Sequence, residues 1–298
     1  MAAVRRERFR AIGTMACGVF FFSLLDAGLK HLAASLPPVE VMALRAAASL
    51  PFLAAWILVR GAWRELAARH PHLYLVRGAL GLWVLWSFIY AVSLQSLSYT
   101  YSIYMSAPLM VAGLAGPVLG ERVPLSRWAA IVVGLLGVLV ALKPSGGFVP
   151  LGGLVAALSA VGYAINVIAV RAIGRTDSNY AVVFWHLLFV SLVASLMALP
   201  HWQPIPAALW PWIAFCGLTG AIGQFLFTAA FRLAPAATIA PFEYTALPWG
   251  VALDWLVFHN LPHARVLFGG AIVIAGGLYV IWDEHRSGQE HLPEVRPD

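Results

Sequence analysis

Charged residues are scarce in this sequence. Asp, Glu, Lys and Arg make up 11% of its 298 residues, whereas soluble domains carry about 25%. Hydrophobic residues make up 61%, and the mean hydropathy is +0.82. A soluble domain of this composition would lack the polar surface that it needs. We therefore predict an all-α polytopic membrane protein.

Sequence motifs of several other activities are also missing. The two cysteines, Cys17 and Cys216, fall in apolar runs, so they indicate neither a disulfide framework nor a metal site, and we interpret both as buried small side chains. There is no Walker A phosphate-binding loop and no H-E-x-x-H motif. The net charge of +6 comes from arginines spread over the loops. We therefore expect no catalytic residue, no metal, no cofactor and no nucleic-acid partner.

Apolar runs separated by proline and glycine predict ten transmembrane helices, each about 20 residues long, as a hydrocarbon core of ~30 Å requires. The predicted spans are 11–32, 38–59, 72–93, 98–118, 124–142, 150–172, 179–199, 209–231, 236–257 and 264–282. The arginine-rich N-terminus resembles a signal peptide, but the apolar run after it is long enough to span and lacks an A-x-A-like cleavage site. We interpret it as an uncleaved first helix. Residues 285–298 are polar and are predicted to form a disordered cytoplasmic tail.

The distribution of positive charge predicts the orientation. If the N-terminus is cytoplasmic, most arginines outside the spans fall on the inner side, and the outer side receives only Lys30, Lys143 and Arg265. Both termini are then cytoplasmic, as an even number of spans requires. Membrane lipid is therefore an expected partner.

The two halves of the sequence resemble each other. When they are aligned, Phe20–Lys30 falls on Val161–Arg171, and Gly120–Pro124 falls on Phe258–Pro262. Each half contains five predicted spans, an odd number, so the two repeats insert in opposite orientations. Inverted repeats are typical of secondary transporters, whose substrate site lies near the middle of the bilayer between the repeats. Chance similarity between apolar helices is the alternative.

The ends of the two halves carry a further pattern. Pro108 with Gly120–Pro124, and Ala240–Tyr244 in the second half, are each followed by a glycine-rich span, and they resemble the two EamA modules of the drug/metabolite transporter superfamily. The second module departs from the pattern where His259 stands in place of a glutamate. The resemblance implies ten helices in two inverted five-helix repeats, and transport of small metabolites, usually export, across the bacterial inner (plasma) membrane. The predicted repeat units are residues 1–145 and 146–284. Within the superfamily, the aromatic content is similar to that of the YddG aromatic amino-acid exporters.

Glu243 is the most unusual residue of the ninth span. A carboxylate deep in hydrocarbon costs at least ~2.5 kcal/mol, so such a residue is by default a functional candidate. With a rise of ~1.5 Å per residue, four polar side chains from four helices lie roughly 5–8 Å to the cytoplasmic side of the midplane. These four residues are Glu243, His186, Gln224 and Asn166. We expect them to line one substrate-binding cavity in which Glu243 faces His186, with ordinary interhelical hydrogen bonding as the alternative for the polar members.

A second polar layer is predicted on the outer side of the midplane. Asp26 and Arg45 lie at similar depths there and are expected to form a gating or structural ion pair, with Lys30 as the competing partner of Asp26. Buried Tyr and Trp side chains need partners for their polar atoms, which favours a cavity wall over lipid, although helix packing is the alternative. The aromatic candidates for substrate binding are Trp86, Tyr101, Tyr163 and Tyr244.

These features favour a secondary transporter that works by alternating access. Pro108, Pro241 and Pro248 are expected to act as hinges in the fourth and ninth spans. A zwitterionic substrate such as an aromatic or large neutral amino acid would suit polar groups beside an aromatic wall. A proton is left open as a coupling ion. Nucleosides, vitamins, metallophores and cationic drugs are alternative substrates, and a channel, a scaffold or a membrane-embedded enzyme is a less favoured alternative.

Overall fold

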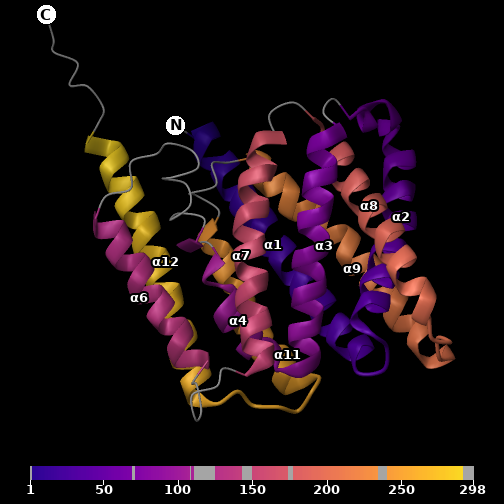
Figure 1. Ribbon diagram of the computed structural model, residues 1–298. Helices are drawn as coiled ribbons and strands as arrows, with labels where there is room; N and C mark the ends of the chain where they lie inside the picture. The colour runs from indigo at the N-terminus through magenta and orange to yellow at the C-terminus, as the bar shows by residue number, and fades with distance from the viewer. Residues whose placement is uncertain are drawn as a thin grey trace, which may run out of the picture.

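The computed structural model describes residues 2–68, 71–107, 109–110, 125–142, 150–173, 177–233 and 240–290. Within these ranges the regular secondary structure consists of α-helices and short 3-10 helices. Figure 1 shows the helices gathered into one bundle, with α1 (Ala2–Ala33) beginning and α12 (Ala264–Glu290) ending at the same end. The predominantly helical fold is therefore confirmed.

The other helices follow the order of the predicted spans. In the first half these are α2 (Pro38–Arg60), η1 (Ala62–Leu66), α3 (Pro71–Leu94), α4 (Leu97–Tyr104) and α6 (Leu125–Leu142). In the second half they are α7 (Leu151–Ile173), α8 (Asn179–Ala198), η2 (Leu199–His201), η3 (Ala207–Leu209), α9 (Trp210–Leu233), η4 (Ala240–Thr245) and α11 (Ala246–Leu256). Among the described residues, 5 stretches are long and apolar enough to cross a membrane: Arg10–Ala33, Pro38–Arg60, Pro71–Leu94, Asn179–His201 and Ala207–Ala230. The boundaries of the repeat units stay predictions. Residues 285–290, predicted to belong to a disordered tail, instead form the last turns of α12, and residues 291–298 lie outside the described residues.

Small polar residues and glycine set several helix ends. Ser96 caps α4, because its Oγ accepts a hydrogen bond from the backbone N–H of Tyr99 at 3.2 Å. Ser178 caps α8 in the same way, with the N–H of Ala181 at 3.1 Å. Gly61 ends α2 with a φ of 65°, a left-handed conformation that glycine adopts without a Cβ clash. These caps satisfy backbone groups that hydrocarbon could not satisfy.

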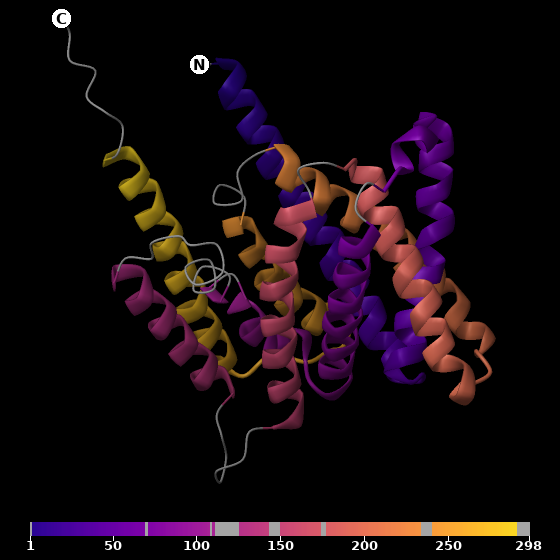
Figure 2. The same cartoon turned by 45° about the horizontal axis from the view of Figure 1, so that its top comes forward.

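Helix packing in the bundle follows a two-fold pattern. Helix α1 packs along α9, and α7, the equivalent of α1 in the second half, packs along α3, the equivalent of α9. Three other pairs join an element to its own equivalent: α2 with α8, α4 with α11, and α6 with α12. Figures 1 and 2 both show α6 beside α12 at one side of the bundle and α2 beside α8 at the other. Such exchanged pairs are expected when an axis relates two repeats, so the packing has a two-repeat architecture.

The ninth predicted span is divided into two elements in its described part. The 3-10 helix η4 contains Pro241 and Glu243, and α11 follows it directly. Pro248 lies in the first turn of α11, where its missing N–H costs no intrahelical hydrogen bond. This proline therefore fits the start of a helix rather than its interior. Pro108 lies outside the described residues, and the hinge role of all three prolines stays a prediction.

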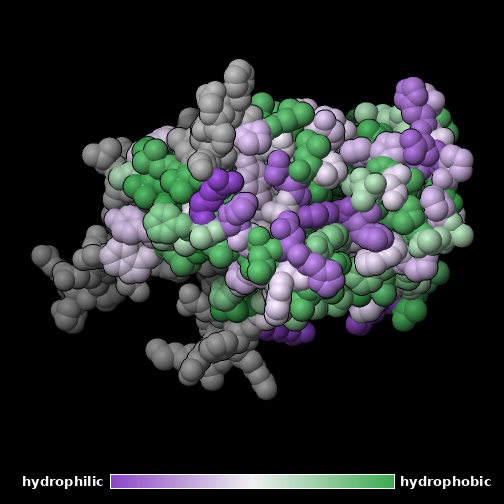
Figure 3. Space-filling view, turned by 90° about the horizontal axis from the view of Figure 1, so that it is seen from below, coloured by the Kyte–Doolittle hydropathy of each residue, from purple (hydrophilic) through white to green (hydrophobic). Residues whose placement is uncertain are grey.

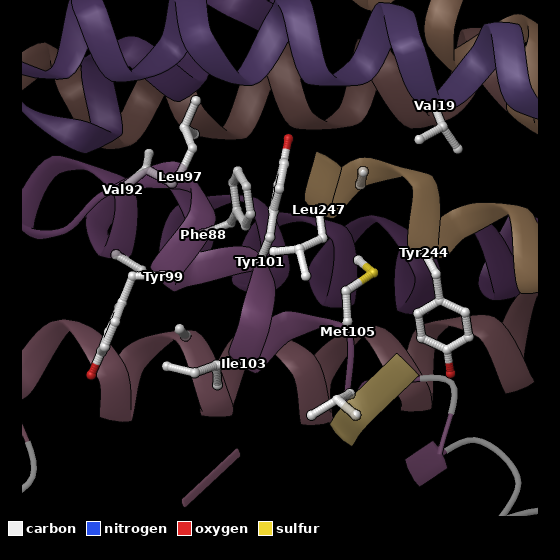
Figure 4. Close-up of a cluster of buried hydrophobic side chains, with 14 of the residues drawn as sticks. Val19, Phe88, Val92, Leu97, Tyr99, Tyr101, Ile103, Met105, Tyr244 and Leu247 are labelled. Atoms are coloured by element: carbon white, nitrogen blue, oxygen red, sulfur yellow. The ribbon is translucent and has the colours of Figure 1, made fainter. Parts of the chain in front are cut away.

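The short helix α4 lies in the middle of a hydrophobic core. Its residues Tyr101 and Ile103 are almost completely buried, and they share one cluster with Phe88 of α3 and Leu247 of α11 (Figure 4). Gly250 of α11 allows a close approach to Tyr101, since a Cβ atom at this position would lie 2.5 Å from Cδ2 of the tyrosine ring. The core therefore fixes the position of the Tyr101 ring from several helices.

Candidate functional site

Glu243 lies in the 3-10 turn η4, where the ninth span departs from α-helical geometry. Its side chain is 9% exposed. One carboxylate oxygen, Oε2, accepts a hydrogen bond from the hydroxyl of Tyr163 on α7 at 3.1 Å. Two residues that the sequence predicts for one site are therefore in contact, and both belong to the second half of the chain.

Asp26 of α1 forms a second carboxylate–tyrosine pair. Its Oδ2 accepts a hydrogen bond from the hydroxyl of Tyr101 on α4 at 2.6 Å, a length typical of a charge-assisted bond. Figure 4 shows the Tyr101 hydroxyl directed towards the ribbon of α1, whereas the hydroxyls of Tyr99 and Tyr244 point the opposite way. The first half of the chain thus provides its own carboxylate held by a tyrosine.

A row of aromatic rings connects the two pairs. The rings of Tyr101 and Phe88 stack with centroids 6.1 Å apart and an interplanar angle of 26°. Phe88 meets Tyr104 edge-to-face at 5.4 Å, and Tyr104 meets Tyr163 at 5.4 Å with an angle of 55°. Offset and edge-to-face contacts at these separations are favourable for aromatic pairs. We call these four residues the aromatic row.

Tyr104 lies between the two carboxylates. Its ring contacts Phe88, which stacks on Tyr101, the partner of Asp26, and it also contacts Tyr163, the partner of Glu243. The aromatic row therefore runs from a carboxylate of the first half to a carboxylate of the second half, and it contains residues from both halves. Asp26, Glu243 and the aromatic row together form the candidate site.

His186 of α8 is not the partner of Glu243. Its ring packs against Gly81 of α3, and its buried Nδ1 has no hydrogen-bond partner among the described residues. These residues also contain no ion pair between His186 and Glu243. The two residues have similar depths along their helices, but His186 contacts α3 whereas Glu243 contacts α7. The predicted Glu243–His186 pair is therefore not formed.

The predicted contact between Asp26 and Arg45 is also absent. Their charges attract each other, but no nitrogen of Arg45 lies within 4.0 Å of a carboxylate among the described residues. Lys30 is not the partner of Asp26 either, because its Nζ pairs with Asp254 at 3.1 Å. Asp26 is instead held by the hydroxyl of Tyr101.

Two predicted amide side chains lie on separate helices of the second half. Gln224 is half-buried on α9. Asn166 is half-buried on α7, and its buried Oδ1 has no hydrogen-bond partner among the residues that the structure describes. Neither forms a side-chain hydrogen bond with Asp26 or Glu243.

Two predicted aromatic side chains lie outside the aromatic row. Tyr244 is 4% exposed, its hydroxyl has no hydrogen-bond partner among the described residues, and it directly follows Glu243 in η4. Trp86 of α3 stacks on Tyr90 of the same helix, with centroids 5.5 Å apart. Tyr244 therefore adjoins the candidate site, whereas the stacking of Trp86 is an ordinary contact along one helix.

Asp254 of α11 is a buried polar centre that is missing from the sequence-based candidates. Its side chain is 0% exposed and pairs with Lys30 of α1. It also accepts hydrogen bonds from the backbone N–H of Leu97 at 3.2 Å, the N–H of Ser98 at 2.8 Å and the hydroxyl of Ser98 at 2.7 Å. These four residues, the Asp254 network, join the ends of α11 and α1 to the start of α4. The signal that singled out Glu243, a carboxylate in an apolar run, was also present here.

The end of the bundle where α1 and α11 finish has a polar face. Figure 3 looks onto this end and shows hydrophilic side chains gathered across its middle, with hydrophobic side chains around them. Polar groups are expected where spans end and water begins. This face lies opposite the end at which α1 begins.

The chemistry of the candidate site suits an organic ligand with charged and apolar parts. Carboxylates attract cationic groups, and aromatic rings favour contact with an apolar or aromatic group. The described residues contain no cluster of three or more His, Cys, Asp or Glu side chains that could hold a metal ion. Binding of a small organic molecule is therefore the activity that the geometry favours.

Comparison with known proteins points to transport. The chain is 29% identical over 261 residues to the pseudopaline exporter CntI of Pseudomonas aeruginosa, an alignment that covers 86% of this chain and 90% of that protein. It is 29% identical over 211 residues to a riboflavin transporter of Vibrio cholerae, with 70% of each chain covered. It is 25% identical over 284 residues to an S-adenosylmethionine uptake transporter of Rickettsia bellii, with 93% of this chain and 97% of that protein covered. The names of these relatives indicate transporters rather than enzymes.

A solved crystal structure and a family match agree with the two-repeat packing. The solved structure superposes with a TM-score of 0.68 at 19% sequence identity, and the superposition covers 93% of this chain and 98% of that one. The EamA-like transporter family matches the chain twice, at residues 9–143 and 150–282. The two matches cover nearly the whole sequence. The chain therefore belongs to the EamA-like transporter family of the drug/metabolite transporter superfamily, and it is a multi-pass inner-membrane transporter of small metabolites.

Proposed function

We propose that this protein is a secondary transporter that exports aromatic or large neutral amino acids. The observation that carries the proposal is the aromatic row with Asp26 at one end and Glu243 at the other. A carboxylate attracts the ammonium group of an amino acid, and aromatic rings favour a planar or apolar side chain. Export is the direction in the name of one relative, the pseudopaline exporter.

The proposed mechanism is alternating access between two inverted repeats of five helices, with ten helices in all and both termini in the cytoplasm. The exchanged packing pairs and the two family matches support this arrangement. Tyr104 and Tyr163 come from different repeats and touch in the aromatic row. Rocking of one repeat against the other would change this contact, so substrate binding and conformational change would be coupled there.

Several further residues are proposed to contact substrate. Buried polar atoms of His186, Asn166 and Tyr244 have no hydrogen-bond partner in the described part of the chain and would be available to a ligand. The full set of proposed additional contacts is His186, Asn166, Gln224, Tyr244 and Trp86. Pro248 lies in the first turn of α11, which follows η4 directly, and it is retained as a proposed hinge.

The names of the relatives leave other substrate classes as the second candidate. Pseudopaline, riboflavin and S-adenosylmethionine are named for three of them. A vitamin or a metallophore is therefore the first alternative to an amino acid, and a nucleoside or a cationic drug comes after these. A rigid aromatic ligand such as a vitamin would also suit the aromatic row.

Counterflow of radiolabelled phenylalanine in proteoliposomes tests the proposed function. The purified full-length protein should give saturable counterflow, because a carrier binds one substrate molecule in each cycle. Unlabelled tryptophan, tyrosine and leucine should compete more strongly than riboflavin, S-adenosylmethionine or choline.

Two results would count against parts of this proposal. If riboflavin or S-adenosylmethionine competes and no amino acid does, the amino-acid proposal is wrong while the family assignment stands. A phenylalanine flux that rises linearly with concentration and shows no counterflow would instead indicate a channel. Liposomes without protein provide the background.

A further inference from the structure

Arg45 of α2 is a buried positive charge without an ion-pair partner among the described residues. It is 6% exposed, and its buried Nε has no hydrogen-bond partner in the described part of the chain. Among the described residues, its guanidinium group forms no ion pair and donates no side-chain hydrogen bond. Breaking a buried ion pair is strongly destabilising because it leaves a charge uncompensated. An unpaired arginine inside a membrane bundle therefore indicates that its charge pairs with a bound ligand.

Asp26 is the negative charge that acts on Arg45. The attraction between the two is present, but they do not approach within 4.0 Å. Asp26 is oriented by the hydroxyl of Tyr101, which bonds Oδ2 and thereby fixes the carboxylate on α1. Cys216 of α9 packs against Gly28 of α1, and Gly217 of α9 packs against Ala48 of α2, so the helices that carry Asp26 and Arg45 both meet α9. Asp26 of α1 and Arg45 of α2 are therefore opposite charges on separate helices that do not form an ion pair.

A second buried arginine, Arg77 of α3, differs from Arg45 because it has a partner. Arg77 is 5% exposed, and its Nη1 donates to the backbone oxygen of Val182 at 3.2 Å. Arg45 has no such partner among the described residues, so its guanidinium group could pair with an anion. An arginine presents a planar fork of donors that matches a carboxylate in two parallel hydrogen bonds.

We infer that Arg45 and Asp26 bind the two ends of a zwitterionic head group, with the substrate carboxylate on Arg45 and the substrate ammonium group on Asp26. This inference rests on the proposed function, because it describes the same site. A zwitterion would pair both buried charges at once without changing the net charge of the site. Asp26 also adjoins Tyr101, the first ring of the aromatic row, so the side chain of the bound amino acid would lie along that row towards Glu243.

Competition with analogues of phenylalanine tests the head-group site in the wild-type protein. Phenylalaninamide and phenethylamine lack the carboxylate, and N-acetylphenylalanine lacks the ammonium group. Each should compete at least about tenfold more weakly than phenylalanine in counterflow, because the buried group that it fails to pair stays unpaired. If phenylalanine competes and all three analogues compete equally well, the head-group inference is wrong and the proposed function stands. If phenylalanine itself neither exchanges nor competes, the proposed function is wrong as well.

Two substitutions assign the two ends of the head group. Arg45→Gln should reduce the preference for phenylalanine over phenylalaninamide to near unity, while Arg45→Lys should retain part of it. Asp26→Asn should reduce the preference for phenylalanine over N-acetylphenylalanine to near unity. Arg64→Gln, which changes an exposed arginine of η1, is the matched control and should keep both preferences.

The preference ratios separate recognition from a purely structural role. If Arg45 and Asp26 only stabilise the fold, their substitution would lower the yield of folded protein and leave both ratios at the wild-type value. That result would overturn the inference. If a variant does not fold, the wild-type analogue series decides the question alone, since it requires no substitution.

Discussion

Asp254→Ala is expected to lower the thermal stability of the purified protein in detergent by on the order of 10 °C. Removing one partner of a buried ion pair costs about 3–5 kcal/mol, because the other charge stays buried without compensation. Asp254 is completely buried, and its loss would leave the ammonium group of Lys30 without its counter-charge. It would also remove the acceptor of the first backbone N–H groups of α4, those of Leu97 and Ser98.

Matched variants show which part of the Asp254 network matters. Lys30→Met removes the positive charge but leaves the hydrogen bonds from α4, so it should cost less than Asp254→Ala. Glu65→Gln changes an exposed carboxylate of η1 and should leave the unfolding midpoint unchanged. If Asp254→Ala and Glu65→Gln unfold at the same temperature, the network does not join α1, α4 and α11.

Glu243→Gln is expected to reduce phenylalanine counterflow about tenfold or more and to leave the unfolding midpoint unchanged or higher. Desolvation of a carboxylate disfavours the folded state, and the one side-chain hydrogen bond to Glu243, from Tyr163, can also be accepted by an amide oxygen. The fold therefore loses little when the charge is removed. The substrate loses an electrostatic partner at one end of the aromatic row, which lowers transport. A combined measurement of counterflow and thermal unfolding on the same preparation separates the two effects.

Glu40→Gln is a control that should have the opposite effects, because it should lower stability and leave transport unchanged. Glu40 is 1% exposed in the first turn of α2, where a negative charge is favourable, and its Oε2 accepts the backbone N–H of Gln203 at 3.2 Å. Its substitution should lower the unfolding midpoint and leave the counterflow per folded molecule near the wild-type value. Wild-type counterflow in the Glu243→Gln variant would remove Glu243 from the transport mechanism.

The helices could be predicted from the sequence because apolar runs, prolines and glycines act locally. The run from 38 to 59 became α2, and Pro38 lies at its first turn. The interruption of the ninth span followed from the same kind of signal, since Pro241 and Pro248 flank the junction between η4 and α11. Local backbone chemistry determines where a helix begins, so a helix start can be recognised from the residues at that position.

Partner assignments within the site could not be predicted in the same way. The rise per residue gives the depth of a side chain, but the side of the helix on which it lies depends on packing. Glu243 and His186 were assigned to the same depth, yet Glu243 contacts Tyr163 and His186 lies against Gly81. Asp26 likewise contacts Tyr101 rather than Arg45. The azimuth of each side chain becomes known only when the neighbouring helices are placed.

The Asp254 network and the middle of the aromatic row were missed for different reasons. Asp254 carried a usable signal, because a carboxylate in an apolar run is costly wherever it lies. Phe88 and Tyr104 carried none, since aromatic residues are common in membrane helices. Only their ring contacts, with centroids 5.4 Å apart, identify them as a link between the two carboxylates.

The position of a bound substrate analogue tests the central claim most directly. The claim is that the substrate lies along the aromatic row between Asp26 and Glu243. Crystals of the full-length protein with para-iodophenylalanine would locate the iodine by its anomalous scattering. We expect an iodine peak beside the rings of Phe88 and Tyr104. A peak elsewhere in the bundle or on its outer surface, with none beside the aromatic row, would contradict the account.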